Sequence, residues 1–419
     1  MREANDGKVS VLLCNENYIG RSRRQQSRVP ATPRSTVERQ QAAKGLPPLA
    51  GGQVQPLPVS LSSQRIAATA ACWFQWQCIE AWVLDDSGFS GPSGTRRSGN
   101  FNNASSWGRL GNNKILRKTE KVCNYWVQGK CSYGDKCRYL HSWSLGDSFS
   151  FLTQLDGHQK VVTGIALPTG SDKLYTGSND ETVRVWGDCQ SGQCMGVIQL
   201  GGEVGCMISE GPWIFVGVPN VVKAWNTQTN TDLSLTGPVG QVYALVVGNE
   251  FLFAGHTVAV VSLVVGADRL YSGSMDHSVR VWNLETLQCV QTLTEHSSVV
   301  MSVLCWDQFL LSCSLDQTIK VWAATESGNL EVAYTHNEEH GLLTLCGMHD
   351  LEGKPVLLCS CNDNSVRLFD LPSFSERGKI YAKQEIRSIQ TGPGGLFFTG
   401  DGTGQVRVWK FVAEPTVSA

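Results

Sequence analysis

Long hydrophobic runs are missing from this chain of 419 residues. Its longer apolar stretches, such as VAVVSLVV, fall far short of the ~20 residues that a membrane-spanning helix needs. The N-terminus, MREANDGKVSVLLCN, has only a brief apolar patch and no cleavage site of small residues. We therefore expect a protein of the nucleus, the cytoplasm or both, with no contact to membranes.

Motifs for common catalytic chemistry are also missing. The sequence has no GxxxxGKS loop for cradling phosphates, no HExxH for a catalytic zinc and no GxSxG nucleophile turn. We therefore expect no enzymatic activity and no small-molecule substrate.

Charge is scarce, and neither sign dominates. Only 17% of the residues are charged, the net charge is −2 and the isoelectric point is near 6.5. This balance excludes a nucleic-acid binder that is basic over its whole surface, so any such contact must be local. The 15 cysteines are an odd number, and many lie inside apolar runs, which indicates free thiols in a reducing compartment.

The chain divides into regions of different composition. Residues 1–112 are rich in Pro, Gly, Ser, Asn and Arg, so we predict that they are mostly disordered. A segment rich in cysteine and aromatic residues occupies residues 117–144. Short apolar alternations punctuated by Gly, Asn and Asp fill residues 150–412, and residues 413–419 form a tail.

Three cysteines and a histidine are concentrated in CNYWVQGKCSYGDKCRYLH. They are Cys123, Cys131, Cys137 and His141, in a C-x7-C-x5-C-x3-H spacing. Thiolate and imidazole are the ligands that zinc prefers, and four of them close a structural site with no open position. The segment has no apolar run that could form a core, so metal binding must supply its stability. The spacing predicts one structural Zn²⁺.

Aromatic and basic side chains lie between these ligands. The aromatic ones are Tyr125, Trp126, Tyr133 and Tyr139, and the cations include Lys121, Lys130, Lys136 and Arg138. Aromatic faces stack on unpaired bases while cations hold the backbone, and the segment is too short to carry a recognition helix into a major groove. We therefore expect single-stranded RNA rather than duplex DNA. The alternative is that the aromatic residues, Trp126 above all, only pack over the zinc site.

The segment resembles the CCCH zinc-finger family, most closely in SYGDKCRYLH. In RNA-binding members of that family, aromatic residues at the positions of Tyr133 and Tyr139 stack on bases. Those members carry tandem fingers, whereas this chain shows one.

From Ser142 onward, one segment recurs along the chain. KLYTGSNDETVRVW returns as RLYSGSMDHSVRVW, FLLSCSLDQTIKVW and VLLCSCNDNSVRLF, and more weakly elsewhere. Most intervals are about 40 residues, the period of a four-stranded propeller blade. The repeats resemble the WD-repeat family over residues 155–410. We expect a mainly β fold, a WD-repeat β-propeller of the seven-bladed type, preceded by the finger.

The WD-repeat resemblance implies a hydrogen-bonded tetrad in each blade, made by a histidine, a strand hydroxyl, a turn aspartate and the closing tryptophan. The matching sets are His158, Ser178, Asp180 and Trp186; His256, Ser274, Asp276 and Trp282; and His296, Ser314, Asp316 and Trp322. His, Ser and Asp also form hydrolase triads, but copies at one repeat period favour a structural unit.

One blade is incomplete in the sequence. The strand that ends at Gly255 runs directly into His256, and the interval from Trp225 to Trp282 is too long for one blade and too short for two. We predict a seven-bladed parent that lost the two outer strands of this blade, which leaves an unpaired edge prone to aggregation and cleavage near Gly255. The alternative is a six-bladed ring with a long loop.

Together the two parts resemble a plant family of CCCH finger proteins with C-terminal WD repeats, over roughly residues 107–412. We expect a non-enzymatic adaptor whose finger contacts single-stranded RNA and whose propeller holds protein partners. Two alternatives remain open. The propeller can act as a substrate receptor or scaffold of a ubiquitin ligase with a structural finger, or the finger can bind DNA in a transcription complex. The repeats lack the basic residue after a WD dipeptide that many ligase receptors carry, which weakens the first alternative.

Overall fold

The computed structural model describes residues 2–3, 9–13, 119–187, 192–249, 251–256 and 260–412. The predicted tail 413–419 and most of the predicted disordered region 1–112 lie outside the described residues. No helix in the described part of the chain is both long enough and apolar enough to cross a membrane.

The finger is a short segment held by few backbone contacts. Strand β3 (Thr119–Val122) pairs in parallel with β4 (Tyr139–Leu140), and between them lie α3 (Asn124–Val127) and a 3-10 turn, η2 (Gly134–Lys136). The Cys123 N–H donates to the Leu140 carbonyl at 2.9 Å, which joins the two ends of the segment. None of the residues of α3 or η2 is buried, so these turns contribute no apolar core.

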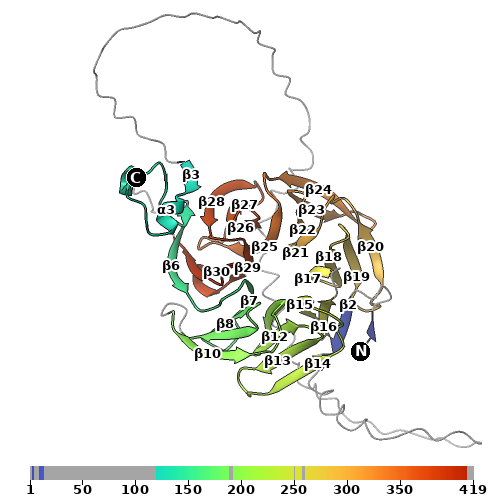
Figure 1. Ribbon diagram of the computed structural model, residues 1–419. Coiled ribbons are helices and arrows are strands. Elements are labelled where there is room, and N and C mark those ends of the chain that lie inside the picture. The colour runs from blue at the N-terminus through green and yellow to red at the C-terminus, as the bar shows by residue number, and fades with distance from the viewer. Residues whose placement is uncertain are drawn as a thin grey trace, which may run out of the picture. The chain divides into compact units, whose positions relative to one another are not determined.

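The rest of the described chain is a ring of antiparallel sheets, the blades of a propeller (Figure 1). The first blade consists of the strands β7 (Val162–Ala166), β8 (Leu174–Ser178), β9 (Thr182–Trp186) and β10 (Cys194–Gln199). The second consists of β11 (Cys206–Glu210), β12 (Trp213–Val218), β13 (Val221–Asn226) and β14 (Asp232–Thr236). A further complete blade consists of β17 (Val260–Gly266), β18 (Arg269–Ser274), β19 (Val279–Asn283) and β20 (Cys289–Leu293).

Three further blades follow, and the last of them is closed by a strand from the start of the propeller. The first of them consists of β21 (Val300–Trp306), β22 (Phe309–Ser314), β23 (Thr318–Ala324) and β24 (Leu330–Asn337). The next consists of β25 (Leu342–His349), β26 (Pro355–Cys361), β27 (Ser365–Asp370) and β28 (Ser375–Tyr381), with β5 (Ser144–Leu145) added at its outer edge. The last consists of β29 (Ile386–Thr391), β30 (Leu396–Asp401) and β31 (Val406–Phe411), and its closing strand is β6 (Phe149–Leu155). A 3-10 turn, η3 (Pro393–Gly395), connects β29 to β30.

The recurring aspartates explain the tight turns between the second and third strands of the blades. The Asp180 carboxylate accepts the Thr182 N–H at 3.1 Å, and Glu181 between them has φ 69°. The same arrangement recurs at Asp316, where the carboxylate accepts the Thr318 N–H at 3.0 Å. An aspartate that bonds the backbone two residues on replaces a backbone turn contact, so this residue fixes the hairpin in repeat after repeat.

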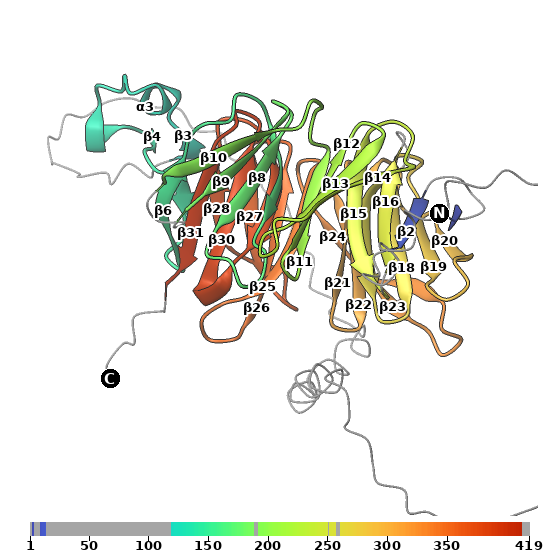
Figure 2. The same ribbon diagram turned by 90° about the horizontal axis from the view of Figure 1, so that it is seen from below.

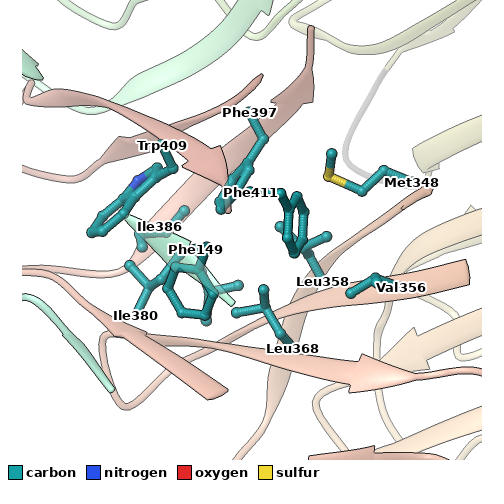
Figure 3. Packing of buried hydrophobic residues seen from close by; sticks show 11 residues of the cluster. Phe149, Met348, Val356, Leu358, Leu368, Ile380, Ile386, Phe397, Trp409 and Phe411 are labelled. Atoms are coloured by element: carbon teal, nitrogen blue, oxygen red, sulfur yellow. The ribbon is translucent and has the colours of Figure 1, made fainter. Parts of the chain in front are cut away.

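The core lies between neighbouring blades. In the cluster of Figure 3, Phe397 and Trp409 stack at 6.3 Å between ring centroids, and Phe149 of β6 packs edge-on against Trp409 at the same distance. Both Phe397 and Trp409 are fully buried. The second strands of the blades, such as β8 and β30, are buried at nearly every position, so side chains on both faces of a blade fill the spaces between sheets and hold the ring rigid.

The expected propeller of the seven-bladed type, with one truncated blade, is corrected to six complete blades, because six sheets have all their strands from residues after 143. The remaining position in the ring is filled by the hairpin β15 (Val242–Gly248) and β16 (Phe251–His256). The expected unpaired edge is also wrong. Strand β2 (Val9–Leu13) pairs with β16, and β1 (Arg2–Glu3) pairs with β2 on its outer side.

Candidate metal centre and nucleic-acid interface

The predicted metal ligands meet at one point of the finger. Cys123 precedes α3, Cys137 follows η2, and His141 follows β4, so each turn of the segment delivers one ligand. The ligand atoms of Cys123, Cys131, Cys137 and His141 all lie within 4.8 Å of one another. Gly129 and Gly134 allow the tight turns between ligands because both have positive φ, 70° and 48°.

The chemistry of these residues fits zinc. The Nε2 atom of His141 is buried and has no hydrogen-bond partner in the protein, which is the position of a metal-binding imidazole nitrogen. Burial raises the pKa of Cys123, but hydrogen bonds from the Trp126 backbone and from the other three ligands outweigh it and lower this pKa to about 7. Thiolate is the form that ligates metal, and three thiols and one imidazole at these mutual distances fit one structural zinc.

The predicted nucleic-acid residues divide into two groups by exposure. The side chains of Tyr125, Tyr133 and Tyr139 are 67%, 70% and 46% exposed. The predicted cations around them, Lys121, Lys130, Lys136 and Arg138, are all exposed as well. Trp126 differs, because its ring stacks on His141 at 5.8 Å with an interplanar angle of 12°. This contact fits the alternative that Trp126 packs over the zinc site.

The finger is joined to the propeller by residues that the sequence analysis does not predict for this role. Trp143 contacts Trp126 on one side, with ring centroids 5.1 Å apart, and on the other the Arg407 guanidinium lies 4.1 Å from a Trp143 ring centroid. The Trp143 carbonyl accepts the Tyr381 N–H at 2.8 Å, and β5 then extends the blade of β25–β28. Only a structure reveals this link, because Trp143 and Arg407 lie far apart in the chain.

The histidines, aspartates and tryptophans of two predicted tetrads come together as expected, but the hydroxyl is a different residue. In the first set, Thr176 bonds both His158 Nε2 at 2.8 Å and Trp186 Nε1 at 2.9 Å. Ser178, the predicted member, instead donates to the Lys160 carbonyl at 3.0 Å. In the third set, Ser312 replaces Ser314 in the same way, with both of its bonds at 2.8 Å.

The second predicted tetrad is also corrected. Trp282 Nε1 donates to Ser272 at 2.9 Å rather than to Ser274. His256 forms the end of β16 in the incomplete blade, and its Nδ1 lies 3.2 Å from the Val239 carbonyl. Asp276 bonds the Ser278 hydroxyl at 2.5 Å, as the turn aspartates of the other sets bond their threonines.

The tetrad geometry fixes the protonation of its members. Burial lowers the pKa of His158, so the ring is neutral, and its Nδ1–H donates to Asp180 at 2.9 Å while Nε2 accepts from Thr176. Burial would raise the pKa of Asp180, but hydrogen bonds from Thr182, the Gln159 amide and His158 lower it to about 2. With these contacts made, the His–Asp pairs hold the hairpins in place, and the Thr176 hydroxyl beside His158 is buried and accepts the Trp186 Nε1–H.

The inner strands leave a central channel with a volume of about 820 Å³. Its lining includes polar side chains, such as Thr163, Gln241 and Arg387, and apolar ones, such as Val161 and Leu343. Tyr243 of β15 is 44% exposed there. The channel offers mixed chemistry suited to binding.

Comparison with known proteins gives matches in both parts of the chain. The CCCH-type zinc finger family matches residues 121–142, and the WD domain, G-beta repeat, matches residues 149–187, 249–283 and 287–323. Zinc finger CCCH domain-containing protein 48 of Arabidopsis thaliana is 68% identical, covering 80% of this chain and 84% of that protein. Protein 63 of the same plant is 65% identical over 80% of this chain and 83% of that protein, and protein 17 of rice, Oryza sativa subsp. japonica, is 61% identical over 70% and 74%.

Among solved structures, the WD40 β-propeller domain of Doa1 is similar to this chain with a TM-score of 0.54. It is 19% identical and covers 63% of this chain and 98% of that domain. At this identity the likeness shows the propeller fold alone.

Proposed function

Because this chain belongs to the family of plant CCCH zinc finger proteins with WD repeats, we propose that it is a non-catalytic adaptor that joins single-stranded RNA to protein partners. The finger binds the RNA, and the propeller binds the proteins. We place this function in the nucleus, the cytoplasm or both.

One observation carries the RNA proposal: three tyrosine rings stand exposed on the finger although the zinc site uses none of them. Trp126 stacks on His141, whereas Tyr125, Tyr133 and Tyr139 stay exposed. Exposed large aromatic rings beside cations are the elements of a base-stacking surface, and each stacked base contributes about 1–3 kcal/mol.

The test is a titration of fluorescent single-stranded RNA with the full chain carrying Tyr133→Ala and Tyr139→Ala. Each substitution should weaken binding by about 1–3 kcal/mol because it removes one stacking face. Tyr133→Phe and Tyr139→Phe are the matched controls, since they keep the ring and should bind nearly as tightly. The zinc content of all variants should stay at one per chain.

Equal affinity of the wild type and the double alanine variant would reject base stacking. A parallel titration with duplex DNA tests the alternative of a DNA-binding finger, which predicts tighter binding of the duplex than of the single strand.

The protein-binding proposal rests on one face of the propeller. Val239, Met275 and Leu315 are exposed in loops that precede a first strand or join a second strand to a third. In an antiparallel blade these two kinds of loop lie at the same end of the sheet, around the mouth of the central channel. Exposed apolar side chains there, next to Tyr243, provide anchors for a partner.

Photo-crosslinking from this face in plant extract tests the proposal. A crosslinkable residue at position 275 should capture a defined set of proteins, and Leu315→Glu should abolish that capture. Val290, exposed on the outer strand β20, is the control site, since Val290→Glu should leave the capture unchanged. Equal loss in both variants would reject the channel face. Ubiquitin-ligase subunits among the captured proteins would favour the receptor alternative over the RNA adaptor.

A further inference from the structure

In the incomplete blade, the repeat region by itself supplies no partner for the outer edge of a strand whose side chains belong to the core. In β16, Leu252, Phe253 and Ala254 are fully buried, and the Leu252 and Ala254 side chains pack in a cluster with Val222 and Val242. A repeat-derived third strand would normally cover this edge, but the chain proceeds from β16 to β17, the first strand of the next blade. An uncovered edge next to a buried strand is a template for strand addition.

The strand on that edge comes from the opposite end of the chain. Strand β2 pairs antiparallel with β16 from Leu13 opposite Phe251 to Val9 opposite Gly255, and β1 adds a further strand outside it. Figure 2 shows β2 beside β16 at the place where other blades carry their third strand.

The pairing register of β2 is the register of a repeat's own third strand. Leu12 lies opposite Leu252, and in complete blades the closing tryptophans occupy this position: Trp186 opposite Leu174, Trp282 opposite Leu270, and Trp322 opposite Leu310. Val11 and Val9 likewise stand where Val185 and Val183 stand in the first complete blade.

The N-terminal sequence has the pattern of a repeat around this strand. Residues 5–12 read NDGKVSVL, and residues 179–186 read NDETVRVW. The Asn-Asp pair and both valines are identical, and each aspartate stands six positions before the residue that closes the strand. The pairing register and the sequence pattern of this segment thus agree.

We propose that residues 2–13 are a built-in donor segment that replaces the missing outer strands of the incomplete blade, within the same chain. The strand pairing covers the β16 edge that the repeat region leaves open. It also fastens the N-terminal strand β2 to the propeller. Because the donor is covalently attached, its effective concentration at the edge is far above that of any free strand.

The central experiment compares the full chain with a variant that lacks residues 1–13. Removal of the donor should lower the melting temperature by more than about 5 °C and speed amide exchange in β16 at least tenfold, because the edge loses its hydrogen bonds. A synthetic peptide of residues 1–13, added in excess, should restore both values, and a scrambled peptide of the same composition should restore neither.

A point variant provides a second route that keeps the whole chain. Val11→Pro removes an N–H from the centre of β2 and should reproduce the effect of the deletion. Asn17→Pro, outside the strand, is the matched control and should behave like the wild type. Faster exchange confined to β16 separates loss of the donor from general unfolding.

Equal melting temperatures and equal exchange in β16 for the full chain, the deletion and Val11→Pro would overturn the proposal. Light scattering decides the source of the strand. A monomer at micromolar concentration supports donation within one chain, whereas a dimer whose β16 protection falls on dilution would overturn it in favour of exchange between two copies.

Discussion

The finger and the propeller use histidine in opposite ways. In the finger, His141 has a buried Nε2 without a hydrogen-bond partner, and its ligand atom lies within 4.8 Å of those of the three cysteines. In the propeller, His158 has both ring nitrogens bonded, to Asp180 at 2.9 Å and Thr176 at 2.8 Å. The His141 ring is suited to binding a metal, whereas the His158 ring is part of a hydrogen-bond network within its blade.

This difference follows from how each part can bury apolar surface. The propeller has fully buried tryptophans at 186 and 409, so its polar tetrads are placed in an existing core. The finger's only buried residues among those described are two of its cysteines, Cys123 and Cys137, so its ligands are also its core. A segment of this kind depends on its metal, whereas a blade depends on its neighbours.

Removal of zinc should give the largest difference in stability between the finger and the propeller. A strong chelator, or Cys131→Ser, should unfold residues 119–143, since structural zinc contributes about 10–16 kcal/mol in small fingers. The propeller should keep its melting temperature because no blade core contains a ligand. Metal analysis together with hydrogen exchange along the chain measures both effects.

Cys289→Ser on strand β20 is the matched control and should retain one zinc per chain. A zinc content near zero in the carefully reduced wild type would contradict the metal site.

The tetrads are tested by two hydroxyl substitutions on one strand. Thr176→Val should cost about 2–4 kcal/mol, because it leaves the buried Trp186 Nε1–H and His158 Nε2 without partners. Ser178→Ala should cost about 1 kcal/mol, since it removes only bonds to backbone groups. Urea unfolding of both variants gives the comparison, and a larger loss for Ser178→Ala would restore Ser178 as the tetrad member.

The sequence predicts those parts of the molecule whose determinants are local. Cys123 and His141 could be predicted because ligand chemistry and spacing lie within one short segment. The tetrad hydroxyl could not, since Thr176 and Ser178 are two apart on one strand and both are buried on the same side. Only the register, with Leu174 opposite Trp186, decides which one the indole reaches.

Contacts between segments that lie far apart in the chain could not be predicted from the sequence either. The link of Trp143 to Arg407 depends on how β5 joins β28, which no pattern near either residue encodes. The sequence NDGKVSVL does indicate that β2 could pair like a repeat strand. Repeats recognised by their closing aromatic residue do not include it, because Leu12 stands where the other repeats have tryptophan.

Acid should weaken the propeller through the same tetrads. The pKa values of His158 and His296 are lowered by burial, so the unfolded chain binds their protons first, and stability should fall as the pH drops through about 6.5. The pKa of Asp180 is about 2 in the fold, so its contribution is present above about pH 4 and lost toward pH 2. Urea midpoints from pH 8 to 3 measure this, and His158→Gln should flatten the slope around pH 6. A propeller equally stable at pH 7 and pH 5 would contradict the neutral, buried histidines.

The smallest expected effect distinguishes the finger's cations from those of the propeller. Lys136 and Lys173 are both exposed, but only Lys136 lies beside the tyrosines of the finger. If Lys136 contacts one phosphate of single-stranded RNA, Lys136→Ala should reduce the slope of log K against log salt by about 0.7, because one fewer counterion is released. Lys173→Ala should leave the slope unchanged. RNA titrations at four salt concentrations suffice for both variants. An identical change in slope for both variants would mean that the RNA backbone also contacts the propeller. The proposal that only the finger binds RNA would then be wrong.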